Sequence, residues 1–171
     1  MKLIKTILLL YITSFSYLVF SSDKAPSIHN LTSLQEHLQF LENAIDDSQE
    51  KLTIVSPFLS IHALNYKGLI KKLESAVSRG VDVTIYTDNR LDVHNHELSN
   101  RSKEARSLLY RTGIPLRVVE HVHCKVVIVD DFCLANGSFN WLSASRSEES
   151  IYANYEVSTL LVGGDLSHHI D

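Results

Sequence analysis

The stretch His121-Val-His-Cys-Lys-Val-Val-Ile-Val-Asp-Asp-Phe-Cys-Leu-Ala-Asn-Gly-Ser-Phe-Asn140 combines a run of β-branched residues with the densest polar chemistry of the chain. Two apolar segments, His123 to Val129 and Phe132 to Asn136, flank the pair Asp130-Asp131. Apolar segments on either side of a short acidic turn are typical of a β-hairpin. The stretch therefore predicts two antiparallel strands with polar residues at both outer ends.

His123 and Lys125 begin this hairpin. Because side chains in a strand alternate with a period of two, both residues are expected on the same face. A neutral imidazole can attack phosphorus, while an ammonium, a hydroxyl and an amide can hold the non-bridging oxygens as charge develops. Lys125, Ser138 and Asn140 provide these three groups. The pattern indicates chemistry on a phosphate ester.

The flanking sequence predicts an α/β fold in one domain. Ser33 and Glu36 form a capping-box pattern at the start of a helix that is expected to reach Ser48. A strand, a helix ending at Gly80 and another strand follow, which predicts a parallel crossover. The expected elements after Ser48 are strands at 52–55, 81–85, 114–119 and 156–162 and helices at 69–79 and 99–112. Together they predict a mixed sheet flanked by helices.

Six residues match the pattern HxKxxxxDxxxxxxGSxN: His123, Lys125, Asp130, Gly137, Ser138 and Asn140. On these residues the chain resembles the phospholipase D superfamily of HKD phosphodiesterases. Phe139 and Trp141 extend the likeness to the small bacterial endonucleases of that superfamily. The resemblance implies a phospholipase D-like fold, with one HKD motif in this chain.

The resemblance also implies roles for individual residues. His123 would be the nucleophile that forms a phosphohistidine, or its partner acid, and Lys125 and Asn140 would bind phosphoryl oxygens with support from Ser138. Glu156 would accept the second imidazole N–H, and Glu148 or Glu149 is an alternative for this role. Asp130 and Gly137 would be structural, and the chemistry would need neither a metal nor a cofactor. Because the mechanism needs two histidines, one motif per chain implies a homodimer with a shared site.

Other polar residues have weaker assignments. His94 and His96 lie in a polar stretch from Thr87 to Leu98 and are candidate substrate contacts, as is Trp141, which could either pack or stack on a base. His121 and His123 have the spacing of some zinc ligands, but no third ligand is apparent.

The N-terminus has the pattern of an export signal. Lys2 and Lys5 precede 15 uncharged residues, Thr6 to Phe20, and then Ser21 and Ser22. We expect a signal peptide at 1–21, a linker at 22–30 and the phosphodiesterase domain at 31–171, in a periplasmic or secreted protein. The alternative is an N-terminal membrane anchor, although 15 residues are short of the ~20 that span a bilayer.

Charge and size limit the substrate class. The chain has a net charge of -4, and removing residues 1–21 leaves 14 basic and 20 acidic residues, a charge of -6. Basic residues nevertheless outnumber acidic ones, ten to six, between Lys67 and Arg117, a region that could line a groove for a polyanion. The sequence favours an endonuclease on DNA or RNA. A phospholipase D or cardiolipin-type hydrolase is the alternative, and a catalytically silent phosphate- or nucleic-acid-binding module is a second alternative.

Overall fold

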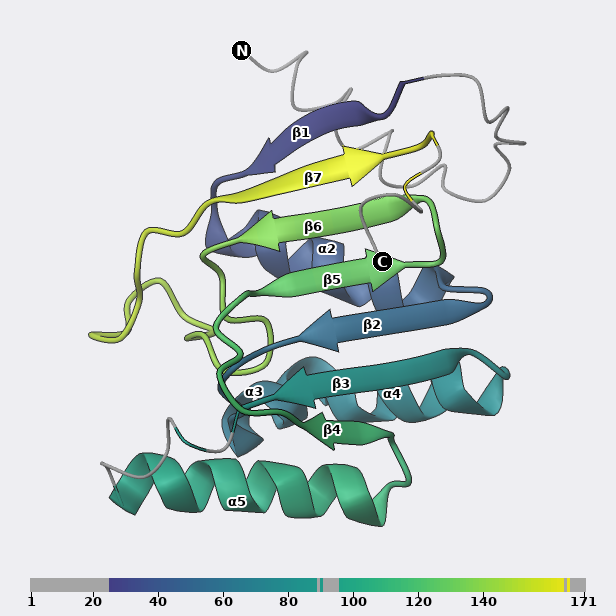
Figure 1. Ribbon diagram of the computed structural model, residues 1–171. Helices are drawn as coiled ribbons and strands as arrows, with labels where there is room; N and C mark the ends of the chain where they lie inside the picture. Colours follow the sequence, from purple (N-terminus) through teal and green to yellow (C-terminus); the bar gives the residue numbers. More distant parts are fainter. Residues whose placement is uncertain (1–24, 89, 91–95, 165, 167–171) are drawn as a thin grey trace.

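A single mixed sheet organises the computed structural model, which describes residues 25–88, 90, 96–164 and 166. Its strand order is β1-β7-β6-β5-β2-β3-β4 (Figure 1). The bounds are β1 Ser27–Leu31, β2 Lys51–Val55, β3 Asp82–Thr87, β4 Leu116–Val118, β5 Val126–Val129, β6 Cys133–Gly137 and β7 Ser158–Val162. The β2–β3 and β3–β4 pairs are parallel and the other neighbours are antiparallel. The predicted mixed α/β sheet is confirmed.

Helices α2 and α4 lie against one face of the sheet, and α5 runs beside the β4 edge (Figure 1). The helices are α2 Leu34–Asp47, α3 Ile61–Asn65, η2 Tyr66–Gly68, α4 Leu69–Ser78 and α5 His96–Arg111. At the start of α2, the Ser33 hydroxyl accepts the Glu36 N–H at 3.2 Å, and the Glu36 carboxylate accepts the Ser33 N–H at 3.0 Å. The predicted capping box is therefore present.

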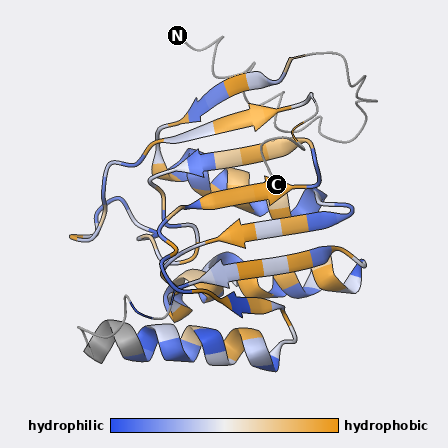
Figure 2. Cartoon of the chain, viewed as in Figure 1, coloured by the Kyte–Doolittle hydropathy of each residue, from blue (hydrophilic) through white to orange (hydrophobic). Residues whose placement is uncertain are grey.

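The core lies between this sheet face and the two helices. Alternate strand residues are buried, among them Leu52 and Ile54 on β2 and Val127 on β5, and they pack with Leu41 of α2 and Leu73 of α4. The hydrophobic colouring is strongest along the central strands (Figure 2). Burial of one side-chain face fixes the register, because a slip of one residue would expose that face.

The topology brings the ends of several strands together on one side of the sheet, the side where β2, β3 and β6 end. Because β5 runs antiparallel to both β2 and β6, the start of β5 lies beside the ends of β2 and β6. β7 is antiparallel to β6, so its start lies on this side too, and β3 ends there because it is parallel to β2 (Figure 1). Residues distant in sequence can therefore share one site.

The linker prediction for residues 22–30 is wrong in part, because Ser27–Leu31 forms the edge strand β1. It pairs antiparallel with β7, with Ile28 opposite Leu161, and the Ser27 hydroxyl donates to the Val162 carbonyl at 3.1 Å. Four of the five residues are exposed, so this strand does not need an apolar face. Its sequence therefore lacks the alternation of apolar and polar residues by which a half-buried strand is identified.

The hairpin is also shorter than predicted. β5 begins at Val126 instead of His123. Val126 pairs with Val55, the last residue of β2, and with Asn136 near the end of β6, so the ladder has little partner strand beyond this point. Val129 pairs with Cys133, so the loop has Asp130, Asp131 and Phe132 instead of two residues. His123 and Lys125 thus lie in an extended segment before the strand.

The predicted signal peptide or anchor at 1–21 lies outside the described residues. Within the part of the chain that the structure describes, no helix combines the length and the apolar character needed to cross a membrane.

Candidate active site

His123 and Lys125 lie side by side at the edge of the sheet. Lys125 Nζ is 3.4 Å from His123 Nδ1, and it donates a hydrogen bond to the His123 carbonyl oxygen at 2.6 Å. The imidazole is exposed, whereas Lys125 is buried. Burial lowers the pKa of Lys125, and the acidic groups of Cys124 and Glu156 oppose this shift. The expected pair is formed, although neither residue belongs to a strand.

A buried carboxylate that the sequence analysis missed holds the segment before His123. Asp88 follows β3 and is completely buried, and it accepts hydrogen bonds from the Val122 N–H at 3.0 Å and from Arg90 Nη2 at 2.8 Å. Burial raises the pKa of Asp88, but the Arg90 and Val122 hydrogen bonds and the Arg90 charge outweigh this effect and lower it. Asp88 lies in the Thr87–Leu98 stretch whose polarity had suggested a ligand-side loop, and that polarity was the only signal.

Gly137 and Ser138 join the end of β6 to the start of β7. A Cβ at Gly137 would lie 2.3 Å from the Val157 carbonyl oxygen and 2.4 Å from Ser158 Cα, so only glycine fits. The Ser138 N–H donates to the Val157 carbonyl at 3.0 Å, and the Ser138 hydroxyl accepts the Val157 N–H at 3.1 Å. In this chain the Ser138 hydroxyl bonds to the backbone of Val157. These bonds hold the chain in place where it leaves β6 and continues to Asn140.

Asn140 has unused hydrogen-bonding capacity. Its backbone carbonyl accepts the N–H groups of Ser143 and Ala144, at 3.1 and 2.8 Å. Its side-chain Oδ1 is buried and has no hydrogen-bond partner among the described residues. A buried polar atom without a partner typically costs about 1–3 kcal/mol. A ligand that donates a hydrogen bond to Asn140 Oδ1 would therefore gain binding energy.

Glu156 precedes β7 and acts on its surroundings through charge. Its carboxylate favours the protonated forms of Lys125 and His37. No hydrogen bond joins Glu156 to His123 within the described part of this single chain, where His123 Nδ1 faces Lys125 instead. The imidazole–carboxylate contact implied by the resemblance is thus not formed here.

His37 is a second buried residue that the sequence analysis missed. Its Nδ1 is 2.8 Å from the Ser33 carbonyl, its Nε2 is 3.0 Å from Ser158 Oγ, and its ring stacks on Phe139 at 4.4 Å. A carbonyl only accepts, so Nδ1 carries the proton and Nε2 accepts from the Ser158 hydroxyl. His37 ties α2 to the start of β7. Its signal in the sequence was its place on the apolar face of the helix, beside Leu38 and Leu41.

Trp141 is not a substrate contact. It is completely buried, and its ring packs against Phe139, Phe40 and His37 at centroid distances of 5.2, 5.5 and 5.7 Å. An indole in this aromatic cluster cannot stack on a base. His94 lies outside the described residues, and His96 begins α5 but its side chain is not described.

Asp130 lies at the opposite end of β5 from Lys125. Its carboxylate accepts the N–H groups of Gln49, Glu50 and Lys51 at 3.2, 2.8 and 2.7 Å. These three bonds fix the backbone just before and at the start of β2. Asp130 thus supports the sheet away from the site.

Part of the basic bias between Lys67 and Arg117 is neutralised within the fold. Lys67 lies 3.5 Å from Glu42, Lys72 pairs with Asp46, and Arg79 donates to the carbonyl of Ile45 at 2.8 Å. All three partners belong to α2, so these cations stabilise the packing of α2 on α4. Lys67 and Lys72 are therefore paired with acidic side chains in this fold, whereas Arg79 is bonded to a neutral carbonyl and keeps its charge.

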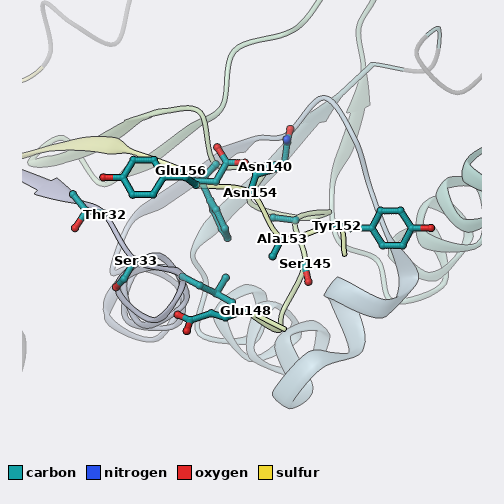
Figure 3. A pocket seen from close by; sticks show the side chains of 13 residues that line it. Thr32, Ser33, Asn140, Ser145, Glu148, Tyr152, Ala153, Asn154 and Glu156 are labelled. Atoms are coloured by element: carbon teal, nitrogen blue, oxygen red, sulfur yellow. The ribbon is translucent and has the colours of Figure 1, made fainter. Parts of the chain in front are cut away.

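A pocket of about 420 Å³ adjoins the site (Figure 3). Asn140 and Glu156 belong to both the pocket and the motif region, whereas His123 and Lys125 do not line it. The remaining lining residues are Thr32, Ser33, Leu34, Phe139, Ala144, Ser145, Glu148, Tyr152, Ala153, Asn154 and Tyr155. Glu148, the alternative carboxylate, thus lies in the pocket with Glu156.

No group of three or more His, Cys, Asp or Glu side chains placed to hold a metal ion occurs among the described residues. The site presents an exposed imidazole, an adjacent ammonium and the Asn140 side-chain amide, whose Nδ2 group is a donor. These groups suit nucleophilic attack on a phosphate ester.

The chain is similar to one family model and to several solved structures. The family model described as "Cardiolipin synthase, PLD-like domain" matches residues 41–171. Among solved structures, NucT from Helicobacter pylori is similar at TM-score 0.59 and 20% identity, covering 85% of this chain and 89% of its own. Phosphatidylserine synthase from Haemophilus influenzae Rd KW20 is similar at TM-score 0.60 and 20% identity, covering 81% of this chain and 35% of its own. No curated protein matches the chain.

Proposed function

The chain belongs to the phospholipase D-like domain family, and we propose that it is a nuclease of this family that cleaves phosphodiester bonds through a phosphohistidine. Membership identifies it as a phosphodiesterase-type enzyme. The observation that carries the proposal is the His123–Lys125 pair, with Lys125 Nζ 3.4 Å from His123 Nδ1. A fixed ammonium beside an exposed imidazole can bind the phosphate and present it to the attacking nitrogen.

In the proposed mechanism one His123 imidazole attacks phosphorus and forms a P–N bond as the P–O bond to the leaving group breaks. A second imidazole protonates the departing oxygen. Water then attacks the phosphohistidine and gives its proton to the second imidazole, and the P–N bond breaks to release the phosphate end and restore both histidines. Lys125 and Asn140 bind the non-bridging oxygens, and Glu156 favours the charged form of Lys125.

The second imidazole is proposed to come from a second copy of the chain. One HxK pair occurs in the sequence, so a homodimer would bring two His123 residues to one two-fold site. Mixed dimers of wild type and His123→Asn would then be inactive at the shared site. A heterodimer with half of the wild-type activity would contradict the shared site.

Nucleic acid is proposed over lipid because of size. A chain of 171 residues with one motif covers most of NucT and is covered by it, whereas it spans about a third of the phosphatidylserine synthase. The fold of this chain therefore corresponds to most of NucT but to only a part of the phosphatidylserine synthase.

The experiment is digestion of plasmid and single-stranded DNA by the chain lacking residues 1–21, in excess EDTA. Wild type should cleave, His123→Asn should not, and the neighbouring exposed residue gives a matched control, His121→Asn, which should remain active. A covalent adduct stable in alkali and released by acid would identify the phosphohistidine. Failure of folded wild-type protein to cleave DNA or RNA would reject the nuclease. Phosphatidylcholine and cardiolipin would then be tested.

Export is proposed separately, on the basic, apolar and small-residue pattern of residues 1–22. Mass spectrometry of protein from the periplasm or medium should find a chain that begins at Ser22. An intact N-terminus in a membrane fraction would favour the anchor.

A further inference from the structure

We infer that the pocket beside Asn140 and Glu156 is a subsite for the nucleobase next to the scissile phosphate, an inference that rests on the proposed nuclease function. The cavity, of about 420 Å³, shares these two residues with the candidate site. Its occupant must therefore lie within one nucleotide of the phosphate that Lys125 and Asn140 would hold. That position belongs to the sugar and base flanking the cleaved bond.

The charge of the lining excludes a second phosphate. Its acidic side chains are Glu148 and Glu156, and its described lining contains no Lys, Arg or His. An anion would be repelled there, whereas a neutral group with N–H donors would be accepted. The pocket thus suits the uncharged part of a nucleotide.

The lining holds acceptors that make no hydrogen bond within the described residues, beside the donor and acceptor groups of Asn154, Tyr152 and Tyr155. Thr32 and Ser33 already bind Glu36, and Ser145 binds the Ser147 backbone. The Glu148 and Glu156 carboxylates remain, together with the unpartnered Oδ1 of Asn140. Amino and imino N–H groups of a base edge complement such acceptors.

Exposed aromatic rings border the pocket. Tyr152 and Tyr155 line it, with 73% and 83% of their surfaces exposed. Figure 3 shows Tyr152 at one border of the group, apart from Asn140 and Glu156, with its ring directed outward. A tyrosine ring offers a stacking face to any base, and stacking tolerates different sequences.

The loop that carries Tyr152 is ordered by its own backbone. The Ala153 N–H donates to the Ser150 carbonyl at 2.9 Å, and the Tyr152 N–H donates to Ser150 Oγ at 3.2 Å. These turns fix the backbone and leave the Tyr152 ring in solvent. The ring is thus available for a ligand without prior rearrangement of a packed side chain.

The test compares Tyr152→Ala and Tyr152→Phe with Tyr110→Ala, a control on α5 whose side chain is 60% exposed and which lies beside β4, at the far end of the sheet from β7. Substrates are a single-stranded oligonucleotide and the same oligonucleotide with abasic residues beside the cleaved bond. On the normal strand, Tyr152→Ala should raise KM about 10-fold, Tyr152→Phe should retain the wild-type KM, and Tyr110→Ala should have no effect. On the abasic strand, wild type and Tyr152→Ala should have the same KM.

Other outcomes separate the two proposals. If wild type cleaves DNA but Tyr152→Ala and Tyr155→Ala keep the wild-type KM, the subsite is wrong and the nuclease stands. The same conclusion follows if these variants raise KM by the same factor on the abasic strand as on the normal strand. A variant that becomes monomeric by sedimentation would instead place the tyrosines in a contact between copies, which also overturns the subsite. Wild type that cleaves no nucleic acid but hydrolyses phosphatidylcholine or cardiolipin vesicles would overturn both proposals.

Discussion

The buried carboxylate of Asp88 accepts the backbone N–H of Val122 at 3.0 Å, one residue before His123. The segment that carries His123 lies outside any strand, so sheet hydrogen bonds do not fix it at this point. Its neighbour His121 has φ of 65°, a left-handed conformation that side chains disfavour. Asp88 is therefore a positioning residue, which sets the place of His123 through Val122.

We expect Asp88→Asn to weaken this contact. Asp88 Oδ2 accepts both the Val122 N–H and Arg90 Nη2, and Oδ1 accepts the Arg90 backbone N–H, whereas an amide replaces one of these two acceptors with a donor group. kcat for DNA cleavage should fall about 10- to 100-fold while KM changes little, since small displacements of catalytic groups have effects of this size. The pH of maximum rate should also move with the altered surroundings of His123. Asp82→Asn, on an exposed residue at the other end of β3, is the control. Unchanged kcat in folded Asp88→Asn would refute the positioning role.

His37 should make folding stability dependent on pH. Burial holds its pKa below the ordinary value of 6.5, so as the pH falls past 6.5 the unfolded chain binds a proton before the folded chain does. The stability that neutral His37 contributes is present above pH 6.5 and is lost as the pH falls below it. Urea unfolding should show a smaller loss below pH 6.5 for His37→Gln than for wild type. Equal pH slopes would assign the acid sensitivity to other groups.

Gly137→Ala should disturb the site as well as the fold. The new Cβ would lie 2.3 Å from the Val157 oxygen, so β7 would have to move away from the motif strand. We expect a loss of about 2 kcal/mol or more in the free energy of unfolding, and reduced kcat in the protein that remains folded. Gly80→Ala is the comparison, because Gly80 has φ of 93° but open space around it. That variant should lose stability from backbone strain and keep its kcat.

Asp130→Ala should reduce stability without altering catalysis by the folded enzyme. The variant loses three hydrogen bonds from backbone N–H groups to a carboxylate, at the end of β5 away from His123. A loss of about 1–3 kcal/mol is expected in thermal or urea unfolding. Asp131→Ala, at the adjacent exposed position, should have little effect on either quantity. A selective loss of kcat in Asp130→Ala would point to a catalytic role instead.

Local signals in the sequence were enough to predict several helices and strands and the residues of the motif. The capping box at Ser33 and Glu36 predicts the start of α2 because both partners lie within one helical turn. The alternation in Val81, Val83 and Ile85 predicts β3, and the spacing of His123, Lys125 and Asn140 predicts a phosphodiesterase of the right family. Each of these signals depends on residues that are close in the chain.

Tertiary structure alone decided the contacts between distant segments. Ser27–Leu31 becomes a strand because β7 supplies its partner more than a hundred residues later, and Trp141 is buried because α2 and Phe139 surround it. Asp88 reaches Val122 and His37 reaches Ser158 across separations that no local pattern records. Such contacts form only when the strand order of the sheet brings these segments together. Once the polar groups are buried there, leaving any of them without a hydrogen bond would be unfavourable.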